Sequence, residues 1–193
     1  DGLYTGTDFP KVKKGMVLSG LTGPVSYRNG MMKLLPRDGK DIILGAPEVA
    51  NITPAVAWQR LGVTGATLPQ GLTVTLSHAP EKDTELEITS DGATIAAPVG
   101  GPFIIKAGQT SLSVDIAGKN PGSVTLSAKV KGGDKTMNAS ITVIAKDAMP
   151  SIASLTPATA KLATTASQVF TVTLDHPAPD LGMEVTVTVA PND

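Results

Sequence analysis

The sequence writes nearly the same strand and turn twice, as LTVTLSHAP at Leu72–Pro80 and as FTVTLDHPAP at Phe170–Pro179. The two copies begin 98 residues apart, whereas the stretches upstream of them, PEVANITPAVA at Pro47–Ala57 and PSIASLTPATA at Pro150–Ala160, begin 103 residues apart. An insertion of five residues near LGVTGATLPQ in the first copy accounts for the difference. We therefore expect an internal repeat of about 100 residues, the size of one small β-sandwich domain.

Alternating apolar and polar residues predict that the first copy is built of short strands. Leu72, Val74 and Leu76 would share one face of a strand, with threonines on the other face. The same pattern, with one short apolar run, marks further strands at Val49–Ile52, Leu86–Ile88, Phe103–Ile105, Leu112–Ile116, Val124–Val130 and Ile141–Val143. Turn residues separate these segments, and no segment offers a convincing helical stripe. About seven such strands predict an all-β fold, a two-sheet antiparallel sandwich.

The stretch FIIKAGQTSLSVDIAGKNPGSVTLSAKV at Phe103–Val130 resembles the immunoglobulin-like (Big-type) repeats of large bacterial surface and extracellular proteins. The TVTL strand followed by a proline-containing loop is also similar to those repeats. The resemblance covers residues 47–146 and again 150–193, and it implies an exported protein whose sandwiches have a structural role. The sequence departs from antibody-type domains because it lacks their paired cysteines, and Trp58 falls too early for their core tryptophan.

The first 46 residues differ from the repeats. The segment VKKGMVLSGLTGPVSYRNGMMKLLP at Val12–Pro36 resembles the later strands of a small OB-like barrel, and its Asn29-Gly30 dipeptide predicts a tight hairpin. We expect three units: a partial OB-like β-domain at 1–46, a complete immunoglobulin-like sandwich at 47–146, and the first half of a second repeat at 150–193. Half a sandwich exposes an apolar face. Residues 150–193 are therefore expected to be completed by neighbouring domains of a longer chain or by another subunit.

Composition excludes several classes of function. The chain has no cysteine, which rules out disulfides, iron–sulfur clusters and thiolate zinc sites. Its net charge is −1, and no apolar run is long enough to span a membrane. Residues 1–46 carry seven Lys/Arg and four Asp/Glu, a balance below the basic footprint of a nucleic-acid-binding protein.

Catalytic motifs are missing from the sequence, which predicts a non-enzyme. The two histidines, His78 and His176, follow matching strands in separate repeats, so we interpret them as turn residues inherited by duplication. The nucleophile elbow, the zinc-protease helix motif, the phosphate-binding loop and the dinucleotide fingerprint do not occur. We therefore expect no catalytic residue and no cofactor, with calcium as an open alternative.

Two weaker sets of site residues remain. An OB-like face binds oligonucleotides or sugars through basic and aromatic residues. Candidates for such a face, with a surface polysaccharide as one partner, are Tyr27, Arg28, Lys33 and Arg37. Calcium favours clustered carboxylates, and the weak candidates for that metal are Glu81, Asp83 and Glu85. The alternative for both sets is an ordinary solvated surface. Trp58 could stack on a sugar or pack at a domain junction.

The function indicated by these features is structural or adhesive, with immunoglobulin-like repeats acting as a spacer or stalk at the bacterial cell surface or in the extracellular medium. Two other classes stay open. One is a carbohydrate- or nucleic-acid-binding module that uses the N-terminal β-domain. The other is an accessory region of a secreted enzyme.

Overall fold

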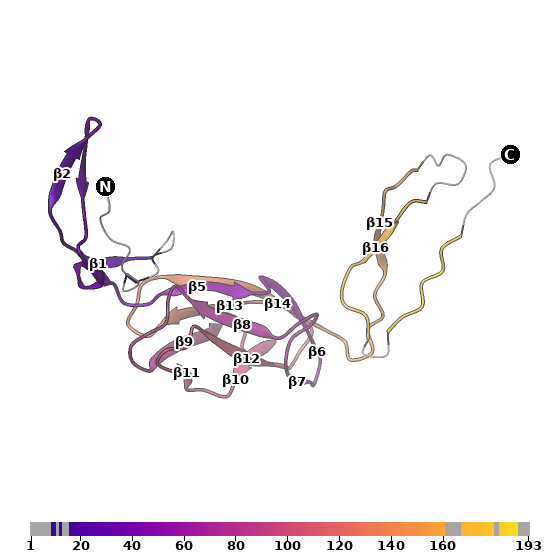
Figure 1. The fold of residues 1–193 in the computed structure, drawn as a ribbon. Helices are drawn as coiled ribbons and strands as arrows, with labels where there is room; N and C mark the ends of the chain where they lie inside the picture. Colours follow the sequence, from indigo (N-terminus) through magenta and orange to yellow (C-terminus); the bar gives the residue numbers. More distant parts are fainter. Residues whose placement is uncertain (1–8, 11, 13–15, 161–166, 180–181, 189–193) are drawn as a thin grey trace.

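The computed structural model describes residues 9–10, 12, 16–160, 167–179 and 182–188. It confirms the all-β prediction, since strands and loops form nearly the whole of the described chain and a single short 3-10 helix interrupts them. Two five-stranded sheets face each other to form a sandwich, from which one β-ribbon projects near each end (Figure 1). The boundaries expected at 46/47 and after 146 stay predictions.

The first sheet has the strand order β10-β12-β8-β5, and the two-residue strand β7 also pairs with β12. Its strands are β5 (Val49–Thr53), β7 (Thr64–Gly65), β8 (Leu72–Leu76), β10 (Ala96–Val99) and β12 (Ser111–Gly118). The second sheet has the order β11-β9-β13-β14-β6. Its strands are β6 (Val56–Arg60), β9 (Thr84–Ser90), β11 (Phe103–Ile105), β13 (Gly122–Val130) and β14 (Thr136–Ile144).

Side-chain alternation decides which face of each strand is buried. In β8, Leu72, Val74 and Leu76 point into the core while Thr73 and Thr75 are half-buried outside it, as a period of two requires. The same alternation in the other strands assembles one continuous core between the sheets. Its largest fully buried side chains are Leu72, Ile105, Ile116, Leu126, Ile141, Gln59, Val49, Val74 and Val114.

The strand prediction was incomplete in three places, because β6, β7 and β10 were not expected. β6 places the polar Gln59 in the core, β10 contains Pro98, and β7 is only two residues long, so none of them shows clear apolar alternation. Gln59 is satisfied there because its amide donates to the carbonyls of Gly65 (3.1 Å) and Ile116 (2.7 Å). The sandwich is also not wholly antiparallel, since β6 pairs in parallel with β14.

The N-terminal segment forms two small ribbons. β1 (Leu18–Leu21) pairs with β4 (Ile42–Leu44), and β2 (Val25–Arg28) pairs with β3 (Met31–Leu34). The expected hairpin turn is confirmed: Asn29 and Gly30 have φ of 56° and 75°, a conformation that suits asparagine and glycine. The 3-10 helix η1 (Gly39–Asp41) connects the two ribbons and is capped by the Asp38 side chain.

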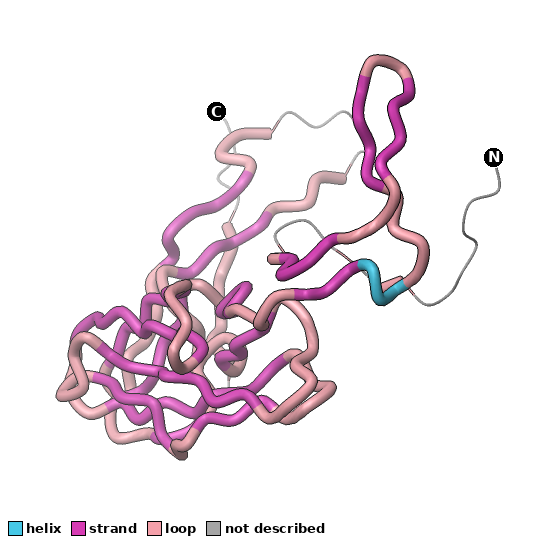
Figure 2. Tube along the Cα trace, turned by 90° about the vertical axis from the view of Figure 1, so that its left-hand side faces the viewer, coloured by secondary structure: helices cyan, strands magenta, loops and turns pink. Residues whose placement is uncertain are grey.

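A third ribbon follows the sandwich and copies one of its strand pairs. β15 (Ile152–Thr156) pairs with β16 (Thr171–Leu174), and the register runs from Ile152↔Leu174 to Thr156↔Thr171 with a bulge near its start. β5 and β8 pair from Val49↔Leu76 to Thr53↔Thr73 with a bulge at the same place. Figure 2 shows this third ribbon and the β2–β3 hairpin as separate projections from the sandwich.

Candidate functional site

The chain enters the sandwich through a short linker that both neighbouring elements hold. The Gly45 amide donates to the Val17 carbonyl (2.8 Å) in the N-terminal ribbon. Three residues later the Glu48 amide donates to the Ser77 hydroxyl (3.2 Å), and the Ser77 amide returns a bond to the Glu48 carbonyl (2.9 Å). Lys135 adds an ion pair to the Glu48 carboxylate (3.3 Å). The entry linker is therefore anchored on both sides.

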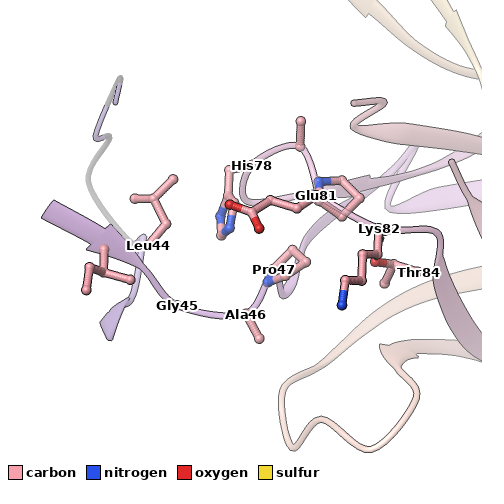
Figure 3. A pocket seen from close by; sticks show the side chains of 11 residues that line it. Leu44, Gly45, Ala46, Pro47, His78, Glu81, Lys82 and Thr84 are labelled. Carbon is pink, nitrogen blue, oxygen red and sulfur yellow. Dashed lines mark hydrogen bonds between the residues drawn. The ribbon is translucent and has the colours of Figure 1, made fainter. Parts of the chain in front are cut away.

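A cleft of about 400 Å³ opens beside this linker, between β4 and the loop that follows β8 (Figure 3). Its lining residues are Ile43, Leu44, Gly45, Ala46, Pro47, His78, Ala79, Pro80, Glu81, Lys82 and Thr84. A second hollow of about 320 Å³ touches the same linker at Ala46–Glu48 and extends to the β13–β14 turn. The two hollows mark a junction between units. Their walls mix short apolar side chains with separate charges and offer no converging set of polar groups, as a small-molecule site would need.

His78, which lines this cleft, contacts the preceding Ser77, with 3.1 Å between the hydroxyl oxygen and Nδ1. The hydroxyl already accepts the Glu48 amide, so it is fixed as a loop-closing group. In the third ribbon Asp175 occupies the equivalent place: its carboxylate accepts the Ser151 amide (2.9 Å) and contacts His176 Nδ1 (2.8 Å). The same turn therefore forms with an aspartate in place of the serine. This argues that Ser77 has a role in the turn and not that of a nucleophile.

The hydrogen bonds of this turn also affect the ionisation of the Asp175 carboxyl. The hydrogen bond from the Ser151 amide, aided by the nearby His176, lowers the pKa of the Asp175 carboxyl from its ordinary value. Because the charged carboxylate is the better acceptor, ionised Asp175 strengthens the start of the β15–β16 pair.

The chain leaves the sandwich through a second linker, which Arg60 holds. From the end of β6 its Nη1 donates to the carbonyls of Lys146 (2.9 Å) and Ala148 (3.4 Å). The Leu61 amide donates to the Ile144 carbonyl (2.9 Å) and extends the β6–β14 pairing to the exit. One guanidinium therefore connects the end of β6 to the segment that leads from β14 into β15. The sequence alone gave no signal for it, since Arg60 is 86 residues from Lys146.

The calcium candidates each have another neighbour. Asp83 accepts from Lys106 Nζ (2.7 Å) and from the Ala107 amide (3.0 Å), and these bonds, Lys106 first, lower the pKa of its carboxyl. Glu85 pairs with Lys131 (2.8 Å), while Glu81 lines the entry cleft. Within the described residues, no three His, Asp or Glu side chains gather as a metal ion would need. Calcium binding stays an untested prediction.

The ligand-binding candidates are divided between places. In the β2–β3 hairpin Tyr27 lies opposite Met32, whereas Arg28 lies opposite Met31 and Lys33 opposite Ser26. Cross-strand partners share a face and neighbours along a strand alternate. Tyr27 is therefore on one face of the ribbon, and Arg28 and Lys33 are on the other. The prediction of a ligand site was based on basic and aromatic residues sharing one face, and in the hairpin they do not share one. Binding of a polysaccharide or nucleic acid here stays a prediction.

The fourth candidate, Arg37, has an exposed side chain that bonds to a buried carboxylate, a contact that the sequence did not reveal. Asp41 is nearly fully buried and accepts bonds from Arg37 Nε (3.0 Å), Arg37 Nη2 (3.1 Å) and the Thr22 hydroxyl (2.7 Å). These bonds, with the Arg37 amide, hold the pKa of the Asp41 carboxyl far below its ordinary value. Asp41 therefore joins η1 to Thr22, just after β1, and Arg37 has a structural use as its ion-pair partner.

Trp58 lies within β6 and not at the entry linker. Its backbone bonds to Leu68 in both directions, at 3.0 and 2.8 Å, and its side chain is half-buried between the core positions Ala57 and Gln59. The two alternatives for Trp58, stacking on a sugar and packing at a domain junction, stay predictions.

No protein-family model matches the chain, and no curated protein matches it. Among solved structures, domains 5-6 of the S-layer protein SbsC align at 18% identity and a TM-score of 0.39, over 54% of this chain and 46% of that one. Domains 4 and 5 of the same protein align at 18% identity and 0.37, over 59% and 62%. A structure of its domains 1-6 aligns at 20% identity and 0.40, over 64% and 16%. The chain thus spans less than two thirds of each of these structures.

No helix in the described ranges is both long and apolar enough to cross a membrane.

Proposed function

We propose that the chain is a non-catalytic structural segment of a modular bacterial surface protein, in which immunoglobulin-like sandwiches act as a spacer or stalk outside the cell. One observation carries the proposal: β6, which directly follows the first strand β5, pairs in parallel with the exit strand β14. β6 and β14 are aligned from Val56↔Ser140 to Arg60↔Ile144. Within the described residues, the cleft beside the entry linker and the charged side chains, which lie apart from one another, do not favour a different function.

A parallel terminal pair suits a protein under tension. The chain passes through β5, reaches β6 at its Val56 end and leaves β14 at its Ile144 end. Once β5 is drawn away from β8, pulling on the two linkers therefore loads opposite ends of the β6–β14 pair. The hydrogen bonds then bear the force together, in shear. An antiparallel terminal pair would open one bond at a time. The bonds from the Ser140 amide to Ala55 (2.8 Å) and from Leu61 to Ile144 lengthen the loaded segment at both ends.

The shared register of β5–β8 and β15–β16 supports a tandem arrangement. The same amide-to-side-chain bond closes both pairs, from Glu48 to Ser77 and from Ser151 to Asp175. We infer that β15–β16 begins a second sandwich, and that Arg60 sets its direction relative to the first. The apolar face of this second unit requires further β-structure, from a continuing chain or from another subunit.

Single-molecule pulling tests the load-bearing function directly. Because the chain has no cysteine, Ala46→Cys and Lys146→Cys provide two unique handles at exposed positions on the linkers. We expect one high-force event that releases roughly 300 Å, since an extended chain spans about 3.3–3.6 Å per residue. The matched control keeps Lys146→Cys and moves the other handle to Val63→Cys. That exposed position lies just beyond the other end of β6, so the same pair opens bond by bond.

The two geometries separate the possibilities. The spacer proposal expects a clearly higher unfolding force for the linker handles than for the Val63 handles. Equal forces in both geometries would show that the parallel pair bears no load, and the spacer function would then be wrong.

A further inference from the structure

Each of the two projecting ribbons has an apolar face that is exposed to solvent. In the sandwich, Val49, Ile52 and Leu72 are 0–2% exposed because the second sheet packs on them. The equivalent residues of the repeat, in the same order, are Ile152 (53% exposed) and Leu155 (40%) in β15 and Phe170 (42%) just before β16. The β15–β16 face therefore carries core residues on an open surface, which marks an interaction site.

The second face is on the β2–β3 hairpin. The register pairs Val25 with Leu34 and Tyr27 with Met32, so these four side chains share one face of the ribbon. All four are exposed, Tyr27 and Met32 by 73% and 74%. β2 pairs only with β3 within the described residues, and an isolated two-stranded hairpin has little stability in water. This face also requires a cover.

The net charges of the two terminal segments indicate which of them attract each other. Residues 1–46 have a balance of +3, whereas residues 150–193 contain one Lys and four Asp/Glu, a balance of −3. Contact between two N-terminal segments, or between two C-terminal segments, would bring like charges together. Contact between an N-terminal and a C-terminal segment brings opposite charges together, which favours encounter and orientation.

We propose that the β2–β3 hairpin of one copy covers the β15–β16 face of a second copy, head to tail. This proposal rests on the spacer function and names the other subunit that completes residues 150–193. The two ribbons project near opposite ends of the sandwich (Figure 1), so the hairpin can contact one neighbour while the β15–β16 face contacts another. Unless such contacts between two different surfaces close into a ring, they repeat and generate a linear array of spacers.

Two substitutions test each face separately in the 193-residue chain. Met32→Glu places a charge on the hairpin face, and Leu155→Glu places one on the β15–β16 face. Neither residue belongs to the sandwich core, so the thermal unfolding of the sandwich checks that folding is intact. Matched controls add the same charge to the opposite sides of the two ribbons, with Ser26→Glu and Ser154→Glu.

Sedimentation velocity at rising protein concentration gives the readout. We expect the unsubstituted chain to form a ladder of dimers, trimers and longer species, and the ladder to weaken in salt because the attraction between the ends is screened. Each face variant alone is expected to associate at least about tenfold more weakly, since an unpaired charge in an apolar contact is costly. The two controls retain the ladder.

Mixing the variants gives the decisive result. Met32→Glu retains an intact β15–β16 face and Leu155→Glu retains an intact hairpin, so their equimolar mixture should form heterodimers and stop there. An unsubstituted chain that stays monomeric, or that stops at a dimer, would overturn the proposal; the second result would indicate a closed pair instead of an open array. Failure of Tyr27→Glu and Phe170→Glu, a second pair on the same faces, to repeat the complementation would overturn it as well. The pulling forces of the single sandwich do not depend on any of these outcomes.

Discussion

Two leucines at equivalent register positions should respond very differently to the same truncation. Leu76 ends β8 opposite Val49, is 3% exposed and packs in the closed core. Leu174 ends β16 opposite Ile152 and is half-buried on the open ribbon. Removal of a buried leucine side chain costs about 2–5 kcal/mol, from lost burial and from the cavity left behind. We expect Leu76→Ala to lower the free energy of unfolding of the sandwich by about 3 kcal/mol.

The matched variant Leu174→Ala should leave that same transition within about 0.5 kcal/mol, because its side chain is outside the sandwich core. Calorimetry reads both effects at once. For a unit of this size, a loss of about 3 kcal/mol corresponds to a fall in Tm of roughly 12–24 °C. Samples are kept dilute so that association does not contribute. If Leu174→Ala lowered the main transition as far as Leu76→Ala, the two ribbons would belong to one core and the division into a closed and an open unit would be wrong.

Three further changes test individual contacts. Arg60→Met retains most of the packing but removes the donor to the carbonyls of Lys146 and Ala148. The distribution of distances between spin labels at Thr89→Cys and Thr173→Cys should therefore broaden. An unchanged distribution would show that Arg60 does not set the direction of β15–β16. Gly118→Ala would place a Cβ 2.5 Å from the Arg60 carbonyl oxygen and 3.0 Å from Gln59 Cγ, and the resulting shift of β6 should cost roughly 1–3 kcal/mol in urea unfolding. Because the pKa of folded Asp41 lies below its ordinary value of 3.8, the stabilisation it provides is fully present above that pH and is lost as pH falls towards the folded pKa. Amide protection in β1 and β4 should therefore weaken on acidification, and Asp41→Asn should remove that pH dependence, unless the network with Arg37 and Thr22 is unimportant.

The sandwich was largely predictable from the sequence because burial and alternation agree along most of its strands. In β8, β12 and β13 the apolar residues alternate with polar ones and are buried or partly buried, and glycine or proline marks the turns. The pattern failed at β6, where Gln59 is buried with its own hydrogen-bond partners. Period-two reasoning treats such a residue as exposed, so it missed the strand whose parallel pairing carries the proposed function.

The junction contacts could not have been read from the sequence. Arg60 reaches Lys146 through space, and the contact depends on β6 and β14 being parallel neighbours. The hairpin shows the reverse case, because Asn29-Gly30 predicted the turn correctly and thereby fixed the register. That register placed Tyr27 and Lys33 on opposite faces, a consequence that the list of basic and aromatic residues did not take into account.

Hydrogen exchange tests the central claim most directly: a closed sandwich is flanked by two open ribbons that cover one another between copies. Amides of β8, β13 and β14 should be strongly protected at every protein concentration. Amides of β2–β3 and β15–β16 should be weakly protected in dilute solution and gain protection together as concentration rises. Strong protection of β15–β16 in the dilute monomer would contradict the open face, and protection that rises in one ribbon without the other would contradict the head-to-tail contact.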